Sequence, residues 1–387
     1  MQEVSSHTFS YWEKQYLAHT HWLIVGAGLV GLQSAIALKE QFPNKRILVI
    51  DEKALGNAAS FRNAGFACFG SAGELIDEMR RTSADEALKL YERRYLGIQK
   101  LIQNFGKEAI GFEATGGYEV FTESEADKFS DISAQLMGLN QQLQAIHGNA
   151  NTFQLKEIGS TGMRALPTAV FAAEEGPIQT HLLYKAVREK AAKVGVEILE
   201  GYTVAAIDDK VGGVSIWLSD ALEIQCDFVL VATNGFSKRL MPEVAVSPAR
   251  GQVFITEPLP YQPLNGIYHA DDGYIYFRSL GDRILIGGGR NQAFAAEETM
   301  QMHNTELIRN YIHQYVSEVI LPHRPKDNPV KFEYQWAGIM GMNENRNPII
   351  QFHSSRILLA IRMGGMGVAL SSWVAEEVMK QVKEIVI

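Results

Sequence analysis

The first clear pattern along the chain is at residues 22–25, where four apolar residues follow one another without alternation. Such a run is typical of a central strand that is covered on both faces. Three glycines interrupt the pattern, and apolar residues then recur at helical spacing over residues 32–42. A second apolar run, residues 46–50, ends in Asp51. A strand, a helix and a strand within about thirty residues predict a βαβ unit with two parallel strands.

Helical spacing returns further along the chain. Ser83 begins a Ser-Ala-Asp-Glu sequence that is typical of a capping box. The apolar residues that follow it predict one buried helix face, made of Leu88, Tyr91, Tyr95, Ile98, Leu101 and Phe105. Thr180 is expected to cap a further helix, which Gly195 ends. The remaining helices are predicted at residues 124–146, about 297–321, and 369 to the end of the chain.

Short apolar runs bounded by turn residues predict the strands. The predicted strands are residues 196–199, 203–208, 214–218, 228–233, 252–256, 274–278, 283–288 and 356–361. The three runs between residues 251 and 289 are separated by turns such as Asp271-Asp272-Gly273, so we expect them to pair in the antiparallel sense.

These elements predict an α/β protein with two domains. The first is a Rossmann-like domain that is assembled from the separated segments 19–82, 161–247 and 331–387. The second, of α+β type, combines an antiparallel sheet with helices and is made from residues 83–160 and 248–330. A chain of 387 residues is long enough for two such domains.

Composition and charge exclude several classes of protein. Hydrophobic residues make up 46% of the chain and charged residues 21%, which is typical of a globular protein. The net charge of −8 argues against nucleic acid or an anionic membrane surface as a partner. Cys68 and Cys226 provide neither a disulfide framework nor a zinc-ligand spacing, so no metal is expected. The sequence has no secretory signal pattern and no long apolar segment, and we expect a cytoplasmic protein without an integral membrane segment.

The sequence GAGLVG places Gly26, Gly28 and Gly31 in the G-x-G-x-x-G pattern. In this pattern one glycine makes the strand-to-helix turn, one lets the main chain approach a pyrophosphate, and one lets the helix pack on the strand. The motif follows a predicted strand and opens a predicted helix. Asp51 at the end of the second strand is suitably placed for an adenosine ribose. The motif predicts a dinucleotide site, and by itself it does not separate FAD from NAD.

Residues 54–70 form a long run of small residues where a nicotinamide domain would continue with another βα unit. Its core, Ser60-x-Arg62-Asn63-x-Gly65, resembles the flavin-facing loop of the amine and amino-acid oxidoreductases typified by D-amino-acid oxidase, glycine oxidase and monomeric sarcosine oxidase. The chain most resembles the branch that contains gamma-glutamylputrescine oxidase, which also carries an aromatic pair such as Tyr11-Trp12 before the dinucleotide motif. The resemblance covers most of the chain, and it makes the Rossmann-like domain FAD-binding and the second domain substrate-binding.

The resemblance implies FAD as the cofactor and indicates which residues bind it. These residues are Gly26, Ala27, Gly28, Leu29, Val30, Gly31, Asp51, Glu52, Lys53, Ala59, Ser60, Arg62, Asn63, Ala64, Gly65, Val204, Ala232, Thr233, Asn234, Gly235, Gly338, Gly364, Gly365, Met366, Gly367, Val368 and Ala369. The last six belong to a glycine loop and helix that, in the family, face the flavin pyrimidine. A helix N-terminus there would stabilise negative charge on the reduced flavin.

The chain departs from the family at three positions. The stretch 336–350 has no cysteine where sarcosine-oxidising relatives tether the flavin, so we expect noncovalent FAD. Ile339 and Met340 stand where glycine oxidase-like members place a carboxylate-gripping arginine, which argues against a simple α-amino acid as substrate. Leu285 falls near the position of an oxygen-activating lysine, which argues against fast reaction with O2.

Substrate contacts are expected from the antiparallel domain. Tyr274, Tyr276 and Arg278 alternate along one predicted strand and would share one face. Arg290 is a second candidate for a carboxylate remote from the amine, although a structural ion pair is an equal expectation for either arginine. Phe66, Cys68 and Phe69 could line the pocket or pack in the core. No catalytic acid or base is identified, because hydride transfer to a flavin does not require one.

The resemblance implies an enzyme that oxidises a C–N bond of a small amine or N-substituted amino acid by hydride transfer to flavin N5, with hydrolysis of the imine product. The electrons would pass to O2 or another acceptor. One alternative is an FAD-dependent dehydrogenase of a 2-hydroxy acid or polyol that uses a quinone or carrier protein. Another is a flavin-binding or redox-sensing protein without turnover. A monomer or small homo-oligomer is expected.

Overall fold

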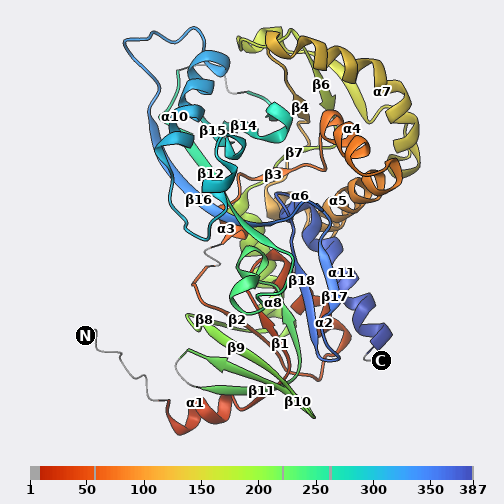
Figure 1. The fold of residues 1–387 in the computed structure, drawn as a ribbon, viewed down its shortest axis with the longest axis vertical. Coiled ribbons are helices and arrows are strands. Elements are labelled where there is room, and N and C mark those ends of the chain that lie inside the picture. The colour runs from red at the N-terminus through yellow and green to blue at the C-terminus, as the bar shows by residue number, and fades with distance from the viewer. Residues whose placement is uncertain (1–8, 56–57, 220–221, 261–263, 386–387) are drawn as a thin grey trace. The chain divides into compact units, whose positions relative to one another are not determined.

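The computed structural model describes residues 9–55, 58–219, 222–260 and 264–385 (Figure 1). Residues 56 and 57 of the small-residue loop, and the first eight residues of the N-terminal stretch, lie outside this part. The chain forms two compact units: unit 1 comprises Met1–Phe61, Tyr184–Pro248 and Met340–Ile387, and unit 2 comprises Arg62–Leu183 and Ala249–Ile339. Residues 62–82, 161–183 and 331–339, expected in the Rossmann-like domain, cluster with unit 2.

Unit 1 is built on a sheet whose central strands are parallel. Its path has the order β17-β18-β11-β1-β2-β8, and β9 and β10 extend from β11 as an antiparallel meander. The strands are β1 (His19–Val25), β2 (Ile47–Asp51), β8 (Glu197–Glu200), β9 (Val204–Lys210), β10 (Gly213–Leu218), β11 (Glu223–Val231), β17 (Ile349–Phe352) and β18 (Ile357–Ile361). Strands β18, β11, β1, β2 and β8 run parallel, so their carboxyl ends meet at one edge.

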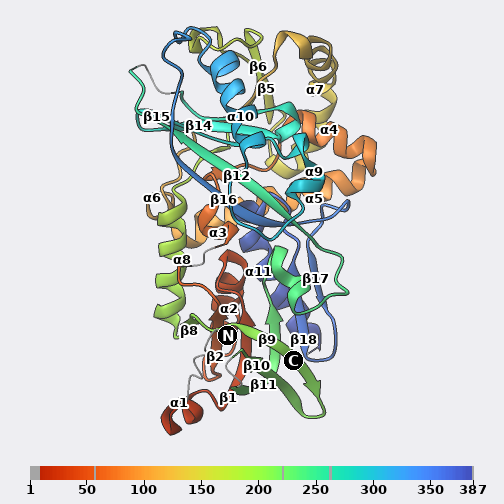
Figure 2. The same ribbon diagram turned by 60° about the vertical axis from the view of Figure 1, so that its left-hand side comes forward.

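Helices cover one face of this sheet. They are α2 (Leu29–Gln41), α8 (Thr180–Val194) and α11 (Gly367–Ile385), and the short α1 (Tyr11–Tyr16) precedes β1. Hydrogen bonds from Gln33 to Ser371 and from Ser372 to Gln33 join α2 to α11, and Lys190 pairs with Glu40 between α8 and α2. The ribbons of these three helices are labelled in Figure 2. The unalternated apolar run of β1 is buried, as expected for a strand covered on both faces.

Unit 2 contains a second sheet, which is mostly antiparallel. Its order is β16-β12-β15-β14-β13-β4-β6-β5, and the β13–β4 pair is parallel. The strands are β4 (Gly117–Glu119), β5 (Phe153–Glu157), β6 (Thr168–Ala172), β12 (Ser247–Thr256), β13 (Ile267–Ala270), β14 (Ile275–Leu280), β15 (Arg283–Gly288) and β16 (Phe332–Met342). A separate two-stranded ladder joins β3 (Phe66–Ala67) to β7 (Gly176–Pro177). The predicted α/β fold with a second sheet domain is therefore confirmed.

The remaining helices are α3 (Ala59–Arg62), at the boundary of the two units, and α4 (Ala72–Arg81), α5 (Ala84–Phe105), α6 (Lys107–Ile110), α7 (Ala126–His147), α9 (Phe294–Glu297) and α10 (Glu306–Tyr315) of unit 2. Ser83 caps α5 by accepting a hydrogen bond from Glu86 N, as predicted. Tyr91, Ile98 and Leu101 of its predicted face are buried.

The predicted helix over residues 297–321 is wrong. α9 ends at Glu297, α10 begins at Glu306, and a π-helical turn (Val316–Ile320) follows. Gln252 of β12 accepts a hydrogen bond from Thr305 N at 2.8 Å, and its amide donates to the buried Glu297 carboxylate at 2.9 Å. These contacts hold the intervening segment against the strand, and apolar spacing alone does not reveal them.

Candidate active site

The turn between β1 and α2 contains three glycines with close neighbours. Gly26 has a φ of 110°, and a Cβ atom on it would lie 2.8 Å from the carbonyl oxygen of Ala232. A Cβ atom on Gly31 would overlap the carbonyl oxygen of Gly26, and one on Gly28 would lie 2.9 Å from the Ser60 hydroxyl. Close approach of the main chain therefore excludes side chains at Gly26 and Gly31, whereas the neighbour of Gly28 is a side chain. The same close approach suits a pyrophosphate.

The N-terminus of α2 offers main-chain donors at this turn. Its N-cap residue, Gly28, supplies no side-chain cap. The Ser60 hydroxyl accepts a hydrogen bond from Leu29 N at 2.9 Å, which ties the predicted Ser60 to the first turn. The helix dipole and the first-turn N–H groups together make this end of α2 suited to binding a phosphate.

Asp51 lies at the carboxyl end of β2, next to the glycine turn. Its carboxylate accepts hydrogen bonds from Ala27 N at 2.7 Å and Lys53 N at 2.9 Å. Burial raises the pKa of Asp51, while the two main-chain hydrogen bonds oppose that shift. The hydroxyl of Tyr184, which the sequence did not single out, donates to Ala27 O at 2.9 Å and fixes the other side of the turn.

Two further loops of unit 1 reach the same edge of the sheet, after β11 and β18. From β1 the chain adds β2 and then β8 on one side of the sheet. It later adds β11 and then β18 on the other side of β1, so the strand order reverses between β1 and β11. Ligands of open α/β sheets bind at such points, beyond the carboxyl ends of the strands.

Main-chain strain marks the loops after β11 and β18. Asn234 and Arg362 adopt positive φ angles of 46° and 66°, which non-glycine residues rarely do. The Asn234 side chain accepts a hydrogen bond from Met363 N at 3.0 Å, and Gly364 pairs with Gly341. Within unit 1 the predicted Asn234 is thus joined to Met363, which directly precedes the predicted residues 364–369.

The remaining predicted residues of unit 1 extend this edge. Gly201 N and Tyr202 N donate to Asp51 O, which places the start of β9, at Val204, just beyond the β2 end. Glu52 pairs with Arg239 at 3.4 Å. The glycine turn, the N-terminus of α2 and the Asp51 carboxylate fit the ADP half of a dinucleotide such as FAD.

The predicted residues Arg62, Asn63, Ala64 and Gly65 belong to unit 2, where side chains fix their conformation. Asn63 Oδ1 accepts hydrogen bonds from Gly65 N and from the Thr180 hydroxyl, both at 2.9 Å. Arg62 Nη1 donates to Ala337 O at 3.0 Å, directly before the predicted Gly338 in β16. These contacts tie the loop to β16 and to the start of α8.

Arg278 makes further contacts with the same loop. Its guanidinium donates to Ala64 O at 3.0 Å and Ile178 O at 3.4 Å, and only 4% of the residue is exposed. Burial lowers its pKa to about 10, against a raising effect of Glu113. Nε and Nη2 of Arg278 therefore donate to main-chain carbonyls, and these contacts help to position the loop.

Aromatic side chains cover the face of the unit 2 sheet beside this loop. The ring of Phe66 lies 5.6 Å, between centroids, from both Tyr276 and His269, and Trp336 Nε1 donates to Arg62 O at 2.8 Å. Burial lowers the pKa of His269. The face is therefore apolar, and the neutral form of its histidine is favoured.

The predicted substrate residues do not gather in one place. Tyr276 and Arg278 both lie on the face beside the 62–66 loop, but the expectation that Tyr274 shares it is wrong. Tyr274 precedes β14, and its N–H donates to Asp271 O in a 3-10 turn, so strand alternation starts only at Ile275. Tyr274 and Arg290 instead lie against the ring of Phe294, at 5.6 and 4.8 Å.

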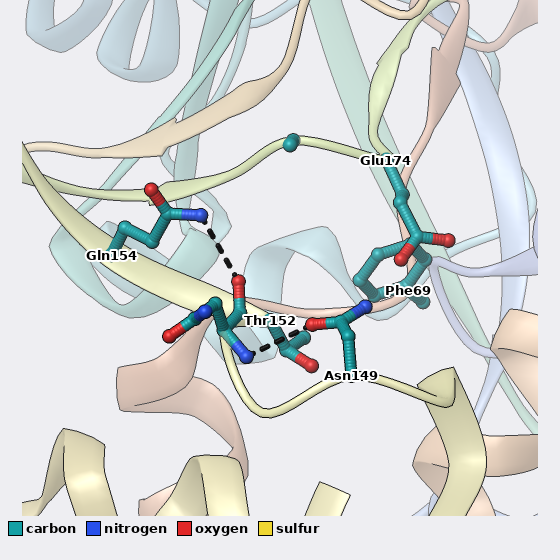
Figure 3. A pocket seen from close by; sticks show the side chains of 7 residues that line it. Phe69, Asn149, Thr152, Gln154 and Glu174 are labelled. Atoms are coloured by element: carbon teal, nitrogen blue, oxygen red, sulfur yellow. Dashed lines mark hydrogen bonds between the residues drawn. The ribbon is translucent and has the colours of Figure 1, made fainter. Parts of the chain in front are cut away.

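Phe69 lies in another environment. Its ring makes edge contacts with Tyr91, Tyr95 and His147, at centroid distances of 5.3 to 5.5 Å. It also lines a cavity of about 320 Å3 in unit 2 (Figure 3). Cys68 is buried, and burial raises its thiol pKa, so it has no thiolate character.

Two buried carboxylates that sequence reasoning missed hold the segment after the 62–66 loop. Glu175 accepts a hydrogen bond from Phe69 N, and Glu119 accepts one from Gly73 N, both at 2.9 Å. Burial raises the pKa of Glu175 to about 8 and that of Glu119 to about 7. Their sequence neighbours give no signal, because acidic residues in short strands, like Glu119, and in the connections between strands, like Glu175, are usually exposed.

Among residues 9–55, 58–219, 222–260 and 264–385, none of the helices combines the length and the hydropathy needed to span a lipid bilayer. The same residues contain no group of three or more His, Cys, Asp or Glu side chains that could hold a metal ion.

Comparisons with known proteins agree with this geometry. A family model described as DAO, FAD dependent oxidoreductase, matches residues 21–381. A probable oxidoreductase, OrdL, of Haemophilus influenzae is 23% identical over 373 residues, which cover 92% of this chain and 81% of the relative.

Two solved structures share the fold. Glycine oxidase from Geobacillus kaustophilus superposes with a TM-score of 0.74 at 19% identity and covers 95% of both chains. L-alpha-glycerophosphate oxidase from Mycoplasma pneumoniae, solved with FAD bound, has a TM-score of 0.71 at 14% identity, over 94% of this chain and 95% of that chain.

Proposed function

Because this chain belongs to the family of FAD-dependent oxidoreductases, we propose that it oxidises a C–N bond of a small amine or of an N-substituted amino acid. FAD is its cofactor, and it accepts a hydride from the substrate carbon when bound. The substrate loses a further proton from nitrogen, and the resulting imine takes up water and splits into a carbonyl compound and an amine. The electrons then pass to O2 or to another acceptor.

The observation that carries the amine proposal is the composition of the face beside the 62–66 loop. Phe66, Tyr276 and Trp336 make this face aromatic, and Arg278 donates to main-chain carbonyls. A substrate that needs a cation to bind its carboxylate at this place would meet Arg278, whose guanidinium already donates to main-chain carbonyls. A substrate without a carboxylate, or with a remote one, is favoured.

The chain's own residues favour the reactive form of an amine on this face. An apolar surrounding disfavours the ammonium form, because burial penalises charge. His269 also favours its neutral form there and adds no charge of its own. Phe66 and Tyr276 supply rigid walls that exclude water and orient a small substrate.

We further propose that FAD is held noncovalently and that reaction with O2 is slow. The strand β16 (Phe332–Met342) contains no cysteine. Cys68 and Cys226 are both buried. Leu285 is apolar and 4% exposed, so no charge from it assists O2 reduction. Acid precipitation should release flavin into the supernatant, whereas flavin that stays with the pellet would contradict the first proposal.

A second candidate function is the oxidation of a hydroxyl-bearing substrate. The fold shared with a glycerophosphate oxidase supports it, since one fold carries both chemistries. The same apolar face would then exclude water around a C–O bond instead of a C–N bond.

Anaerobic bleaching of the bound flavin tests both functions. The purified yellow protein is mixed with primary amines, N-methylated amino acids, 2-hydroxy acids and glycerol phosphate, and loss of flavin absorbance is followed. We expect bleaching by an amine or an N-substituted amino acid. Bleaching by hydroxy compounds alone would support the second candidate. Failure of every compound to bleach a flavin that dithionite still reduces would contradict both and favour a non-catalytic flavoprotein.

A further inference from the structure

The cavity beside Phe69 is lined by residues of two other segments than those described above. They belong neither to the glycine turn and Asp51 of unit 1, which we call the dinucleotide edge, nor to the aromatic face of Phe66, Tyr276 and Trp336 beside the 62–66 loop. Its volume is about 320 Å3, within the range of small-molecule sites. The lining residues are Phe69, Asn149, Asn151, Thr152, Gln154, Ala173 and Glu174. In Figure 3 Glu174 and Phe69 lie at one end and Gln154 at the other. None of these described residues carries a positive charge.

A buried hydroxyl lines this cavity without a partner. Thr152 is only 5% exposed, and its Oγ1 makes no hydrogen bond to any described residue of the chain. A buried polar atom left in this state costs free energy comparable to a lost hydrogen bond. A ligand that donates to this oxygen would remove the cost.

The other polar side chains around the cavity keep acceptors as well as donors. Gln154 donates its amide to Asn151 O at 3.1 Å, so its carbonyl oxygen is left to accept. Asn149 uses its oxygen to accept from Asn151 N at 2.9 Å, and its amide nitrogen remains a donor. The Thr152 hydroxyl and the Glu174 carboxylate add acceptors, and the fixed charge of the lining residues is negative.

The His147 side chain contacts the Glu174 carboxylate and limits its movement. His147, whose side chain is fully buried, lies with Nδ1 3.0 Å from Glu174 Oε1, and its ring lies 4.0 Å from the Tyr95 ring, between centroids. The two rings pack against Phe69. A carboxylate that is fixed beside aromatic rings is the usual environment for recognition of an organic cation.

We propose that this cavity binds the primary ammonium group of a small organic amine, with Glu174 as counter-charge and Thr152 and Gln154 as hydrogen-bond acceptors. An anion would meet the Glu174 carboxylate without a cation to offset it. A neutral ligand would bring no counter-charge to Glu174 from the side of the cavity. The ammonium group belongs either to a separate small amine or to a second amino group of the substrate.

Binding of tert-butylammonium to the oxidised holoenzyme tests the proposal. This ion has no hydrogen on the carbon that bears nitrogen, so the flavin cannot oxidise it, and its binding is independent of the proposed function. Isothermal titration calorimetry should give a Kd on the order of millimolar for an ion of this size. The neutral isostere tert-butanol should bind at least about tenfold more weakly.

Matched variants locate the binding. Glu174→Gln should weaken tert-butylammonium binding by about tenfold or more, and Thr152→Val by about threefold, since a hydrogen bond to a charged group is lost. Glu318→Gln, at an exposed position of the π-helical turn, should leave binding unchanged. FAD content and thermal unfolding confirm that each variant is folded. Equal binding of the ion and the alcohol, or unchanged binding in Glu174→Gln, would overturn the proposal.

A competition measurement identifies the source of the ammonium group. It rests on the proposed function, because it needs an amine that bleaches the flavin. Inhibition of that bleaching by tert-butylammonium, lost in Glu174→Gln, supports a cavity that holds part of the substrate. Binding without inhibition supports a separate amine site.

Discussion

The two units fix their loops by opposite means. At the dinucleotide edge of unit 1, main chain meets main chain: Gly26 lies against Ala232 O, and Gly31 against Gly26 O. In unit 2, buried side chains hold the 62–73 segment, with Arg278 on Ala64 O and Glu175 on Phe69 N. A site made from main chain demands glycine at fixed positions, whereas one made from side chains admits many residue types.

The difference also concerns charge. The dinucleotide edge of unit 1 offers N–H groups and a helix terminus, which keep their polarity at every pH, together with one ionisable group, the Asp51 carboxylate. Unit 2 relies on ionisable groups whose burial shifts their pKa, such as Glu175 and Arg278. We therefore expect FAD binding at the dinucleotide edge to be lost when a substitution fills the space beside its glycines. The conformation of the 62–73 segment of unit 2 should instead depend on charge and pH.

The largest expected effect is that of Gly31→Ala. The added methyl group would overlap the carbonyl oxygen of Gly26, so α2 must move away from the turn. We expect FAD affinity to fall by at least about 100-fold, because the first-turn N–H groups leave their positions. Flavin absorbance per chain after purification measures the loss.

Gly138→Ala is the matched control for that variant. Gly138 lies inside α7, and a Cβ atom there meets nothing within 4 Å. Alanine should keep full FAD content and raise stability by up to about 1 kcal/mol. Normal flavin content in Gly31→Ala would show that the turn tolerates a side chain.

An intermediate effect is expected for Glu175→Gln, and it depends on pH. The folded-state pKa of about 8 lies above the ordinary value of 4.5, so the folded chain holds a proton that the unfolded chain releases between these values. Stability from this group is therefore lost as pH rises through this window. Glutamine still accepts from Phe69 N but cannot ionise.

The variant should accordingly gain stability relative to the parent protein as pH rises from 5 to 8, by roughly a few kcal/mol at most. Thermal unfolding across this pH range measures the difference. Glu108→Gln, at an exposed position of α6, should follow the parent protein at every pH. Parallel curves for Glu175→Gln and the parent protein would rule out a buried, titrating carboxyl at this position.

The smallest effect is expected for Arg278→Lys. Lysine keeps the charge but cannot reach Ala64 O and Ile178 O together, so we expect a loss of about 1–2 kcal/mol of stability. For amines without a carboxylate, KM should change little. Arg80→Lys, on the exposed face of α4, should change stability by less than about 0.5 kcal/mol.

A large rise in KM confined to carboxylate-bearing substrates, with stability unchanged, would instead identify Arg278 as a substrate-binding residue. Denaturant unfolding and steady-state kinetics on the same preparation separate the two outcomes.

Local signals in the sequence were enough to predict the glycine turn between β1 and α2 and the position of Asp51 beside it. Gly26, Gly28, Gly31 and Asp51 were readable because a pyrophosphate site built from main chain leaves few residue choices, and their spacing is local. The βαβ unit and the helix that Ser83 caps followed from periodicity and capping, which are also local signals. Thr180 was expected to cap α8, but it is the first residue of that helix and donates its hydroxyl to Asn63.

The side-chain contacts within unit 2 depend on tertiary packing and could not be predicted from the sequence. Apolar spacing extended a helix through residues 298–305, where Gln252 and Glu297 hold an irregular segment. Tyr274 was expected on the face of Tyr276 because alternation was counted from a residue that lies in a turn. Glu175 and Thr152 gave no local signal at all. Their roles depend on burial by segments far away in the chain, and burial is a property of packing that no single stretch of sequence contains.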